Sequence, residues 1–332
     1  MIRTPGWYYR KQAQGAPWWR PALKPLAWLW QAVNKRKRQD ARPYASSLFV
    51  ISVGNLTLGG SGKTPITAEI LRLLAPEATG LSKGHGGTVE GPARVAATDD
   101  ARHVGDEALM LAQAYPFMIA KDRAQGLRAL EAGTASIVVV DDAHQNLKIA
   151  TDLNILVIDG DTKDGAWPFG DYGVVPYGPM REPLDEGLAR ADICVLWMPD
   201  GLSQPDPELV ERLAGKPLFV ARLTAEKPAR TGAVTAFAGI AKPWKFEVTL
   251  KSLGFHVVHF KAFPDHAAVP ATQLKALEKL GAPLMTTQKD WVKLDVDWRQ
   301  KVAFLPITAR FDDEAGFATA LRAFMRVTVQ GA

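Results

Sequence analysis

From residue 48 onward, short apolar runs alternate with segments in which apolar residues recur at helical spacing. The run Leu48–Val53 predicts a buried strand, and Thr64–Leu74 predicts a helix with an apolar face, in whose first turn Pro65 is tolerated. Such alternation is typical of a mostly parallel sheet covered by helices on both faces. The same pattern predicts further strands at Phe117–Ala120, Ile137–Val140, Ile155–Ile158 and Ile193–Trp197, and helices at Glu107–Ala114 and Arg123–Ala132.

A second set of alternating elements begins near Leu218. The polar stretch Pro199–Pro207 could separate the two sets, and so could Ala225–Gly232. We therefore expect an N-terminal segment over residues 1–46, an α/β domain over 47–214 and a smaller α/β domain over 215–332. The second set predicts strands at Leu218–Arg222, Val234–Ala238, His256–Phe260, Leu284–Thr287 and Val302–Leu305, and helices at Lys245–Leu253, Thr272–Leu280 and Asp313–Val327.

Composition supports one large or two medium-sized domains, since 47% of the 332 residues are hydrophobic. Cys194 is the only cysteine, so the chain cannot form an internal disulfide, which favours a reducing compartment. Its apolar neighbours favour a buried core thiol over a nucleophile, because apolar burial raises a thiol pKa.

The N-terminal segment differs from the rest in charge and aromatic content. The net charge of the whole chain is +5, but residues 1–42 hold ten Lys or Arg against one acid, Asp40, and also five of the ten tryptophans. No run of about 20 apolar residues is long enough to span a bilayer. A cleaved signal peptide is disfavoured because the basic cluster Lys35–Arg38 follows the apolar part.

Tryptophan mixed with basic residues suits the headgroup layer, so this segment predicts contact with an anionic membrane surface. The alternatives are a solvated basic tail and a helix packed on the body. No companion motif supports a nucleic-acid partner.

The residues Gly59, Gly60, Ser61, Gly62, Lys63 and Thr64 follow a predicted strand and open a predicted helix. In this order they predict a P-loop, whose backbone N–H groups and helix N-terminus bind phosphates. Lys63 would reach the outer phosphates and Thr64 would bind Mg²⁺. The strict pattern has glycine where this chain has Thr57, and Gly59 and Gly60 supply the flexibility instead.

Two acidic motifs could complete such a site. The predicted strand Ile137–Val140 ends in Asp141 and Asp142, a Walker B arrangement in which one carboxylate would hold Mg²⁺. Asp106 and Glu107 begin a predicted helix, where Asp106 is either a simple N-cap or the base that accepts a hydroxyl proton.

The remaining motifs are less specific. His85, His144 and His266 could each be structural or catalytic, and no spacing indicates a zinc site. In GTPases, the motif that binds guanine has one residue between its Lys and its Asp. In the sequence Thr287-Gln288-Lys289-Asp290, the Lys and the Asp are adjacent. An adenine nucleotide is therefore favoured.

Taken in order, these motifs resemble the tetraacyldisaccharide 4'-kinases of lipid A biosynthesis. The resemblance runs from the basic N-terminus to about residue 294, and it includes the P-loop without its early glycine. The matching motifs are Val53–Pro65, Val104–Glu107, Lys121–Arg123, Asp141–Gln145, Gly178–Pro183, Phe237–Ile240, Phe263–His266 and Lys289–Leu294. The chain departs from the family pattern at Lys83, His85, Ala143, His144, Ala267 and Gln288.

The resemblance implies a kinase that uses ATP and Mg²⁺ to phosphorylate the 4'-hydroxyl of a lipid disaccharide 1-phosphate. It also implies two α/β domains joined by a hinge, with the nucleotide at their interface. By the same resemblance we expect a monomer, peripheral or monotopic, at the cytoplasmic face of the bacterial inner membrane. The alternatives are a P-loop ATPase that assists assembly of a membrane complex, and a non-enzymatic adaptor that senses nucleotide.

The resemblance also assigns roles. Lys63, Asp106 as base and His266 as its partner would be catalytic, and the P-loop would bind ATP. Metal ligands would come from Thr64, Glu107, Asp141 and Asp142. Contacts to the substrate would come from Asn55, Arg123, Gln145 and Arg181.

Overall fold

The computed structural model describes residues 5–60, 62–198, 204–225, 231–240, 243–265 and 267–330. Ser61, a predicted P-loop residue, and His266, a predicted catalytic residue, lie outside the described residues. The chain divides into two compact units, each assembled from separate segments. Unit 1 comprises Met1–Leu81, Arg123–Leu223 and Ala309–Ala332, and unit 2 comprises Ser82–Asp122 and Thr224–Thr308.

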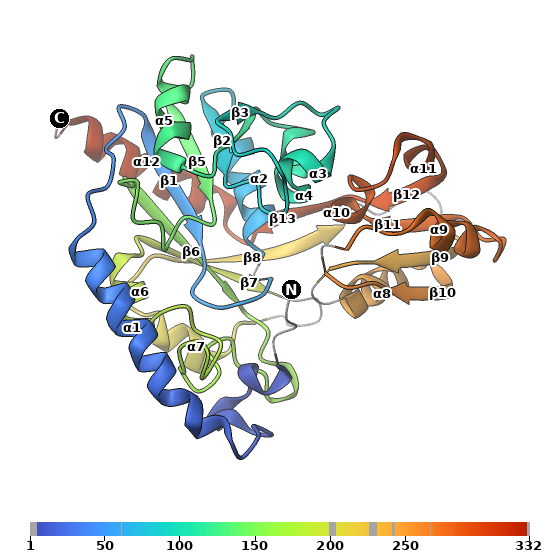
Figure 1. The fold of residues 1–332 in the computed structure, drawn as a ribbon, viewed down its shortest axis with the longest axis horizontal. Coiled ribbons are helices and arrows are strands. Elements are labelled where there is room, and N and C mark those ends of the chain that lie inside the picture. Colours follow the sequence, from blue (N-terminus) through green and yellow to red (C-terminus); the bar gives the residue numbers. More distant parts are fainter. Residues whose placement is uncertain are drawn as a thin grey trace. The chain divides into compact units, whose positions relative to one another are not determined.

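A sheet forms the centre of unit 1 (Figure 1). Its strands are β1 (Phe49–Gly54), β2 (Ala78–Ser82), β5 (Ile137–Asp141), β6 (Leu153–Asp159), β7 (Ile193–Met198), β8 (Leu218–Ala225) and β13 (Ile307–Phe311). They follow the order β13-β8-β7-β6-β1-β5-β2, and the pairs from β2 to β8 are parallel. Val53 lies beside Asp141 in the register of β1 and β5. The predicted phosphate loop and the predicted acids therefore follow adjacent strand ends.

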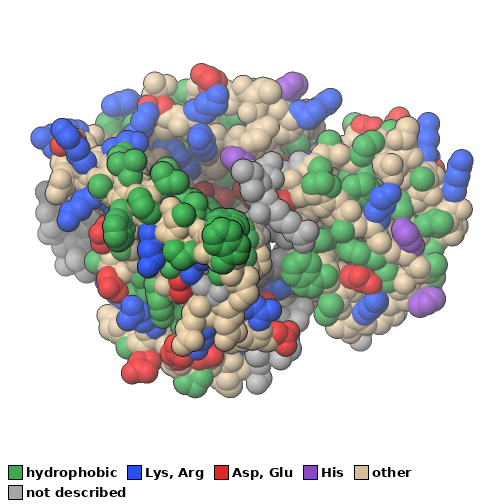
Figure 2. All heavy atoms as spheres, turned by 60° about the horizontal axis from the view of Figure 1, so that its bottom comes forward, with side chains coloured by type: hydrophobic (Ala, Val, Ile, Leu, Met, Phe, Trp, Pro, Cys, Tyr) green, Lys and Arg blue, Asp and Glu red, His purple; other side chains and the backbone are tan. Residues whose placement is uncertain are grey.

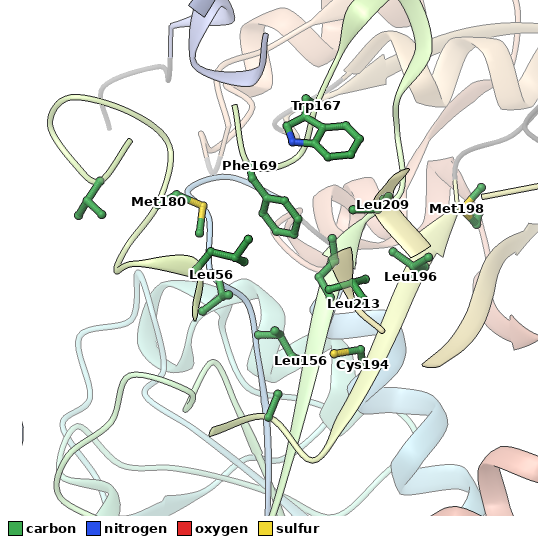
Figure 3. Close-up of a cluster of buried hydrophobic side chains, with 14 residues drawn as sticks. Leu56, Leu156, Trp167, Phe169, Met180, Cys194, Leu196, Met198, Leu209 and Leu213 are labelled. Carbon is green, nitrogen blue, oxygen red and sulfur yellow. The ribbon is translucent and has the colours of Figure 1, made fainter. Parts of the chain in front are cut away.

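Helices cover both faces of this sheet. On one face, residues of β6 and β7 pack against α6 (Leu184–Arg190) and α7 (Pro207–Arg212). Figure 3 shows Leu156, Cys194 and Leu196 of this cluster together with Leu209 and Leu213. Successive side chains of a strand point to opposite faces.

The other face of the sheet holds Phe219, which lies beside Val195 in the register of β7 and β8. Its ring centroid lies 5.3 Å from that of Phe317 in α12 (Glu314–Gln330). The helices α2 (Lys63–Leu73) and α5 (Arg123–Glu131) complete unit 1. The predicted α/β fold with covered faces is confirmed, and so is the burial of Cys194, which has no exposed surface.

The N-terminal arm, which we define as residues 5–42, forms the short turns η1 (Gly6–Tyr9), η2 (Lys11–Ala13) and η3 (Arg20–Leu23) and the helix α1 (Lys24–Gln39). Helix α1 ends in a basic turn, which suits the negative end of its dipole. It runs beside α6, where Arg38 pairs with Glu186 at 2.9 Å (Figure 1). Within the described residues, no helix is both long and apolar enough to cross a bilayer.

A parallel sheet with the order β10-β9-β11-β12 forms the centre of unit 2. The segment Ser82–Asp122 adds an antiparallel pair of strands and two short helices to this unit. Helix α10 packs against α4, so the two segments of unit 2 meet there. The elements are β3 (Ala93–Arg94), α3 (Ala101–Val104), α4 (Asp106–Ala112), β4 (Phe117–Ile119), β9 (Ala233–Ala238), α8 (Pro243–Ser252), β10 (His256–Ala262), α9 (Ala271–Glu278), β11 (Leu284–Thr287), α10 (Gln288–Trp291), α11 (Val296–Lys301) and β12 (Val302–Leu305).

Every strand and helix that the apolar pattern predicts is present; β11 and β12 have the predicted boundaries, and the boundaries of the others are shifted. The pattern did not predict several elements, among them β2, β13 and the helices α1, α6, α7 and α11. Strand β2 reads Ala-Thr-Gly-Leu-Ser, which contains no apolar run, and it forms by pairing with β5. Most apolar residues of helix α1, including its tryptophans, are exposed. They therefore do not recur at the spacing of one buried face, which is the pattern that predicts a helix.

Candidate functional site

The P-loop connects β1 to α2, as the sequence predicts. Gly59 and Gly62 have φ values of 86° and 81°, which favour glycine over other residues. A Cβ atom on Gly62 would lie 2.4 Å from the indole ring of Trp197, so a larger residue has no space there. The conformation of this loop therefore depends on the glycines that the sequence places in it.

Lys63 begins α2, and its ammonium group is held from two sides. Its Nζ donates to Asn55 Oδ1 at 3.1 Å and lies 3.6 Å from Asp142 Oδ1. Asn55 is fully buried, and its Nδ2 donates to the Thr57 carbonyl at 2.8 Å. The amide orientation of Asn55 is therefore fixed, with its Oδ1 facing the Lys63 ammonium.

The predicted acids follow β5. Asp141 is buried and accepts a hydrogen bond from Thr67 Oγ1 at 3.1 Å. Asp142 has a positive φ of 51° and closes a turn against Arg123. The Arg123 Nη2 donates to the carbonyls of Asp141 and Asp142 at 3.2 and 3.0 Å. In this structure Arg123 is buried and supports the acidic turn, while its contact with substrate stays a prediction.

Arg181 and Gln145 complete the cluster in unit 1. Arg181 Nη1 donates to Asp142 Oδ1 at 2.8 Å and to Gln145 Oε1 at 3.2 Å. Gln145 Nε2 donates to the Asn55 carbonyl at 2.9 Å. Burial alone would raise the pKa of Asp142, but the charges of Lys63 and Arg181 outweigh burial and lower it. The structure thus brings together an ionised carboxylate, two cations and two amides beside the P-loop.

The predicted metal ligands are divided between the two units. Thr64, Asp141 and Asp142 belong to unit 1, and Glu107 belongs to unit 2. Among the residues described, no group of three or more His, Cys, Asp or Glu is arranged to hold a metal ion. The hydroxyl and carboxylate oxygens near the P-loop nevertheless suit Mg²⁺, which keeps several waters and needs only one or two carboxylates.

A second cluster of charge lies in unit 2, where Asp106 is the first residue of α4 rather than its N-cap. Lys289 of α10 lies among three carboxylates. Its Nζ is 3.1 Å from Glu107 Oε1, 3.9 Å from Asp106 Oδ2 and 3.8 Å from Asp265 Oδ1. Burial lowers the pKa of Lys289, but these carboxylates raise it further than burial lowers it. The ammonium therefore stays charged.

Sequence reasoning did not assign a role to Lys289. The signal that could have found Lys289 is its position two residues after the end of β11, in the motif Thr287-Gln288-Lys289-Asp290. A residue at the carboxyl end of a parallel strand faces the crevice in which ligands of α/β proteins bind.

A pocket of ≈ 520 Å³ in unit 2 borders Asp106. One part of its wall is apolar and includes Val269, Leu274 and Trp298, and another part is polar and includes His85. A pocket with both kinds of lining can accept a ligand that has polar and apolar parts.

A glycine loop between a parallel strand and a helix, with a lysine held beside an acidic strand end, defines a P-loop nucleotide-binding protein of the α/β class. The family model described as tetraacyldisaccharide-1-P 4'-kinase matches residues 19–326. The chain belongs to this family.

Similar proteins agree with this assignment. A tetraacyldisaccharide 4'-kinase of Phenylobacterium zucineum is 48% identical over 322 residues, which are 95% of this chain and 97% of the relative. A tetraacyldisaccharide 4'-kinase of Caulobacter vibrioides is 46% identical over 332 residues, 97% of this chain and 98% of the relative. The crystal structure of LpxK from Aquifex aeolicus in complex with ATP has a TM-score of 0.71 and 27% identity, and the match covers 92% of this chain and 99% of that one.

Proposed function

We propose that this protein transfers the γ-phosphoryl group of ATP to the 4'-hydroxyl of a tetraacyldisaccharide 1-phosphate. The observation that carries the proposal is the position of Lys63 at the start of α2, between Asn55 Oδ1 and Asp142 Oδ1. A cation held there lies where the outer phosphates of a nucleotide reach in P-loop proteins. Family membership supplies the acceptor.

In the transfer, the bond between the γ-phosphorus and the β,γ-bridging oxygen of ATP breaks, that oxygen leaves on the β-phosphate of ADP, and a bond from the γ-phosphorus to the sugar oxygen forms. Lys63 and the loop amides stabilise charge on the phosphates, and Arg181 adds a second cation beside Asp142. Thr64 and Asp141 or Asp142, with Glu107 as a further predicted ligand, would hold Mg²⁺, which would supply positive charge to the phosphates. Asp106 accepts the hydroxyl proton.

The pocket beside Asp106 supports the choice of acceptor. A lipid disaccharide has polar sugar hydroxyls and apolar acyl chains, and the pocket offers both kinds of wall. Binding in it would place a sugar hydroxyl near the Asp106 carboxylate. Arg123, Gln145 and Asn55 remain predicted contacts to the substrate in unit 1.

The N-terminal arm would bring the enzyme to its lipid at the cytoplasmic face of the inner membrane. Its exposed apolar residues lie among Lys and Arg side chains, and Figure 2 shows hydrophobic and basic side chains gathered on the face that carries α1. The exposed residues are Trp18, Trp19, Leu26, Trp28, Leu29, Trp30 and Val33. Tryptophan rings and basic groups together favour the anionic interface of a bilayer.

An acceptor assay with γ-labelled ATP and the lipid disaccharide tests the proposal. Label in the lipid supports a kinase, and label only in free phosphate supports an ATPase. Binding of nucleotide without turnover supports an adaptor. The variant Lys63→Met should lose transfer, whereas Lys301→Met, which removes an exposed ion pair with Glu278, should keep it.

A further inference from the structure

The segment 177–182 lies between the N-terminal arm and the P-loop. It pairs with the P-loop through backbone hydrogen bonds: Leu58 N–H donates to the Pro179 carbonyl at 2.9 Å, and Arg181 N–H donates to the Leu56 carbonyl at 2.7 Å. Thr57 and Met180 form an antiparallel bridge between these bonds. The path of the P-loop therefore depends on the position of this segment.

The arm binds the same segment on its other side. Arg20 Nε donates to the Tyr177 carbonyl at 2.9 Å, and its guanidinium lies 3.7 Å from the centroid of the Tyr177 ring. Trp30 Nε1 donates to the Arg181 carbonyl at 3.3 Å. The segment is thus held between the arm and the loop.

A chain of polar contacts joins the end of α1 to the P-loop lysine. Arg38 pairs at 2.6 Å with Glu182, whose side chain is 1% exposed. Glu182 Oε1 accepts from Gln145 Nε2 at 2.9 Å, and the same Nε2 donates to the Asn55 carbonyl at 2.9 Å. Asn55 Oδ1 in turn accepts from Lys63. Truncation of Arg38 would remove one of the two arginines that pair with the buried Glu182 carboxylate.

One arm residue contacts the P-loop directly. Tyr9 Oη donates a hydrogen bond to the carbonyl of Leu58. A Cβ atom on Gly59 would lie 3.2 Å from this hydroxyl, so the tyrosine lies against the glycine part of the loop. The backbone N–H of Trp167 donates to the Tyr9 carbonyl at 2.8 Å and fixes the backbone of Tyr9.

We infer that Tyr9 and Arg38 are positioning residues of the nucleotide site, through which the N-terminal arm holds the P-loop in its phosphate-binding conformation. A glycine-rich loop loses conformational freedom when it closes around phosphates, and a loop that is already fixed loses less. The arm therefore contributes to nucleotide affinity as well as to any contact with membrane. The inference rests only on the nucleotide-binding part of the proposed function.

The test compares Tyr9→Phe with Tyr8→Phe. Both changes remove one hydroxyl that donates to a backbone carbonyl, but Pro176, the partner of Tyr8, lies outside the residues that pair with the loop. The dissociation constant of the Mg²⁺ complex of AMP-PNP is measured by calorimetry in detergent, without lipid. We expect a rise of about three- to tenfold for Tyr9→Phe, the equivalent of one hydrogen bond, and less than about twofold for Tyr8→Phe.

A second pair of variants tests the path through Glu182. Arg38→Met should weaken nucleotide binding, while Arg36→Met, on the same helix but exposed and 3.8 Å from Asp40, should not. In the acceptor assay, Tyr9→Phe should raise the KM for ATP and leave the KM for lipid and the binding to anionic vesicles unchanged.

Equal nucleotide affinities for Tyr9→Phe and Tyr8→Phe, in proteins that melt at the same temperature, would overturn the inference. A changed KM for lipid with an unchanged KM for ATP would overturn it too, and would assign the arm to the acceptor alone. If Arg38→Met does not fold, the tyrosine pair decides. Because the binding measurement contains no acceptor, its result is independent of whether the lipid disaccharide is phosphorylated.

Discussion

Replacement of Lys289 by methionine is expected to destabilise unit 2 and to lower turnover. The ammonium lies between 3.1 and 3.9 Å from carboxylate oxygens of Glu107, Asp106 and Asp265, and its side chain is 19% exposed. Methionine preserves much of the side-chain length but removes the charge. Without that charge, the partly buried carboxylates of Asp106, Glu107 and Asp265 repel one another.

The magnitude follows from burial. Removal of one partner from a buried ion pair costs roughly 3–5 kcal/mol, and an exposed pair is worth roughly 0–1 kcal/mol. Asp106 has a side-chain exposure of 7% and Glu107 one of 36%, so the cluster lies between these limits. We expect Lys289→Met to lower the free energy of unfolding by about 2–3 kcal/mol.

The assay is urea denaturation, followed by hydrogen exchange of the amides in α4 and α10 to assign the loss to unit 2. Lys301→Met is the matched control, because it removes a pair with Glu278 of 3.0 Å in the same unit, with side chains 56% and 46% exposed. Lys289→Arg should restore most of the stability, since guanidinium keeps the charge. Equal urea midpoints for Lys289→Met and Lys301→Met would show that the acidic cluster does not need its cation.

Three further predictions concern the proposed base, the P-loop and the thiol. Asp106→Asn should lower turnover by about 10²- to 10⁴-fold and leave the nucleotide dissociation constant unchanged, and near-normal turnover would remove Asp106 from the role of base. Gly62→Ala should abolish measurable nucleotide binding because of its φ of 81° and its 2.4 Å approach to the Trp197 ring, which calorimetry can check. Burial raises the pKa of Cys194 to about 11 from an ordinary 9.0, so the folded protein holds about 100-fold less thiolate at pH 8 than the unfolded chain. Reaction with a chromogenic disulfide should therefore be slow until urea unfolds the chain, and this thiol should lower stability only as the pH rises from about 9 through 11.

Local patterns predicted most of the secondary structure. Strand β5 is buried along its whole length and reads as an unbroken apolar run that ends in acid, so both the strand and the place of Asp141 followed from the sequence. Strand β2 contains no such run, and its pairing with β5 accounts for it.

The P-loop cluster was predicted in its members but not in its contacts. Asn55, Gln145 and Arg181 were assigned to substrate by family resemblance, whereas the structure shows them bonded to one another and to Asp142. Their roles toward substrate remain predictions. The position of Arg123 behind the acidic turn likewise depends on its hydrogen bonds to the carbonyls of Asp141 and Asp142, which its motif does not encode.

The sequence by itself determined the alternation of strands and helices, the P-loop and the ordered motifs of the family. These features are local, because each depends on periodicity or on residue types within a short window. Tertiary structure alone decided that Ser82–Asp122 joins Thr224–Thr308 in unit 2, and that Lys289 meets Glu107 across 182 residues of sequence. It also placed Tyr9 on the carbonyl of Leu58. Such contacts arise when distant segments fold against one another, so that no local pattern of apolar and polar residues specifies them.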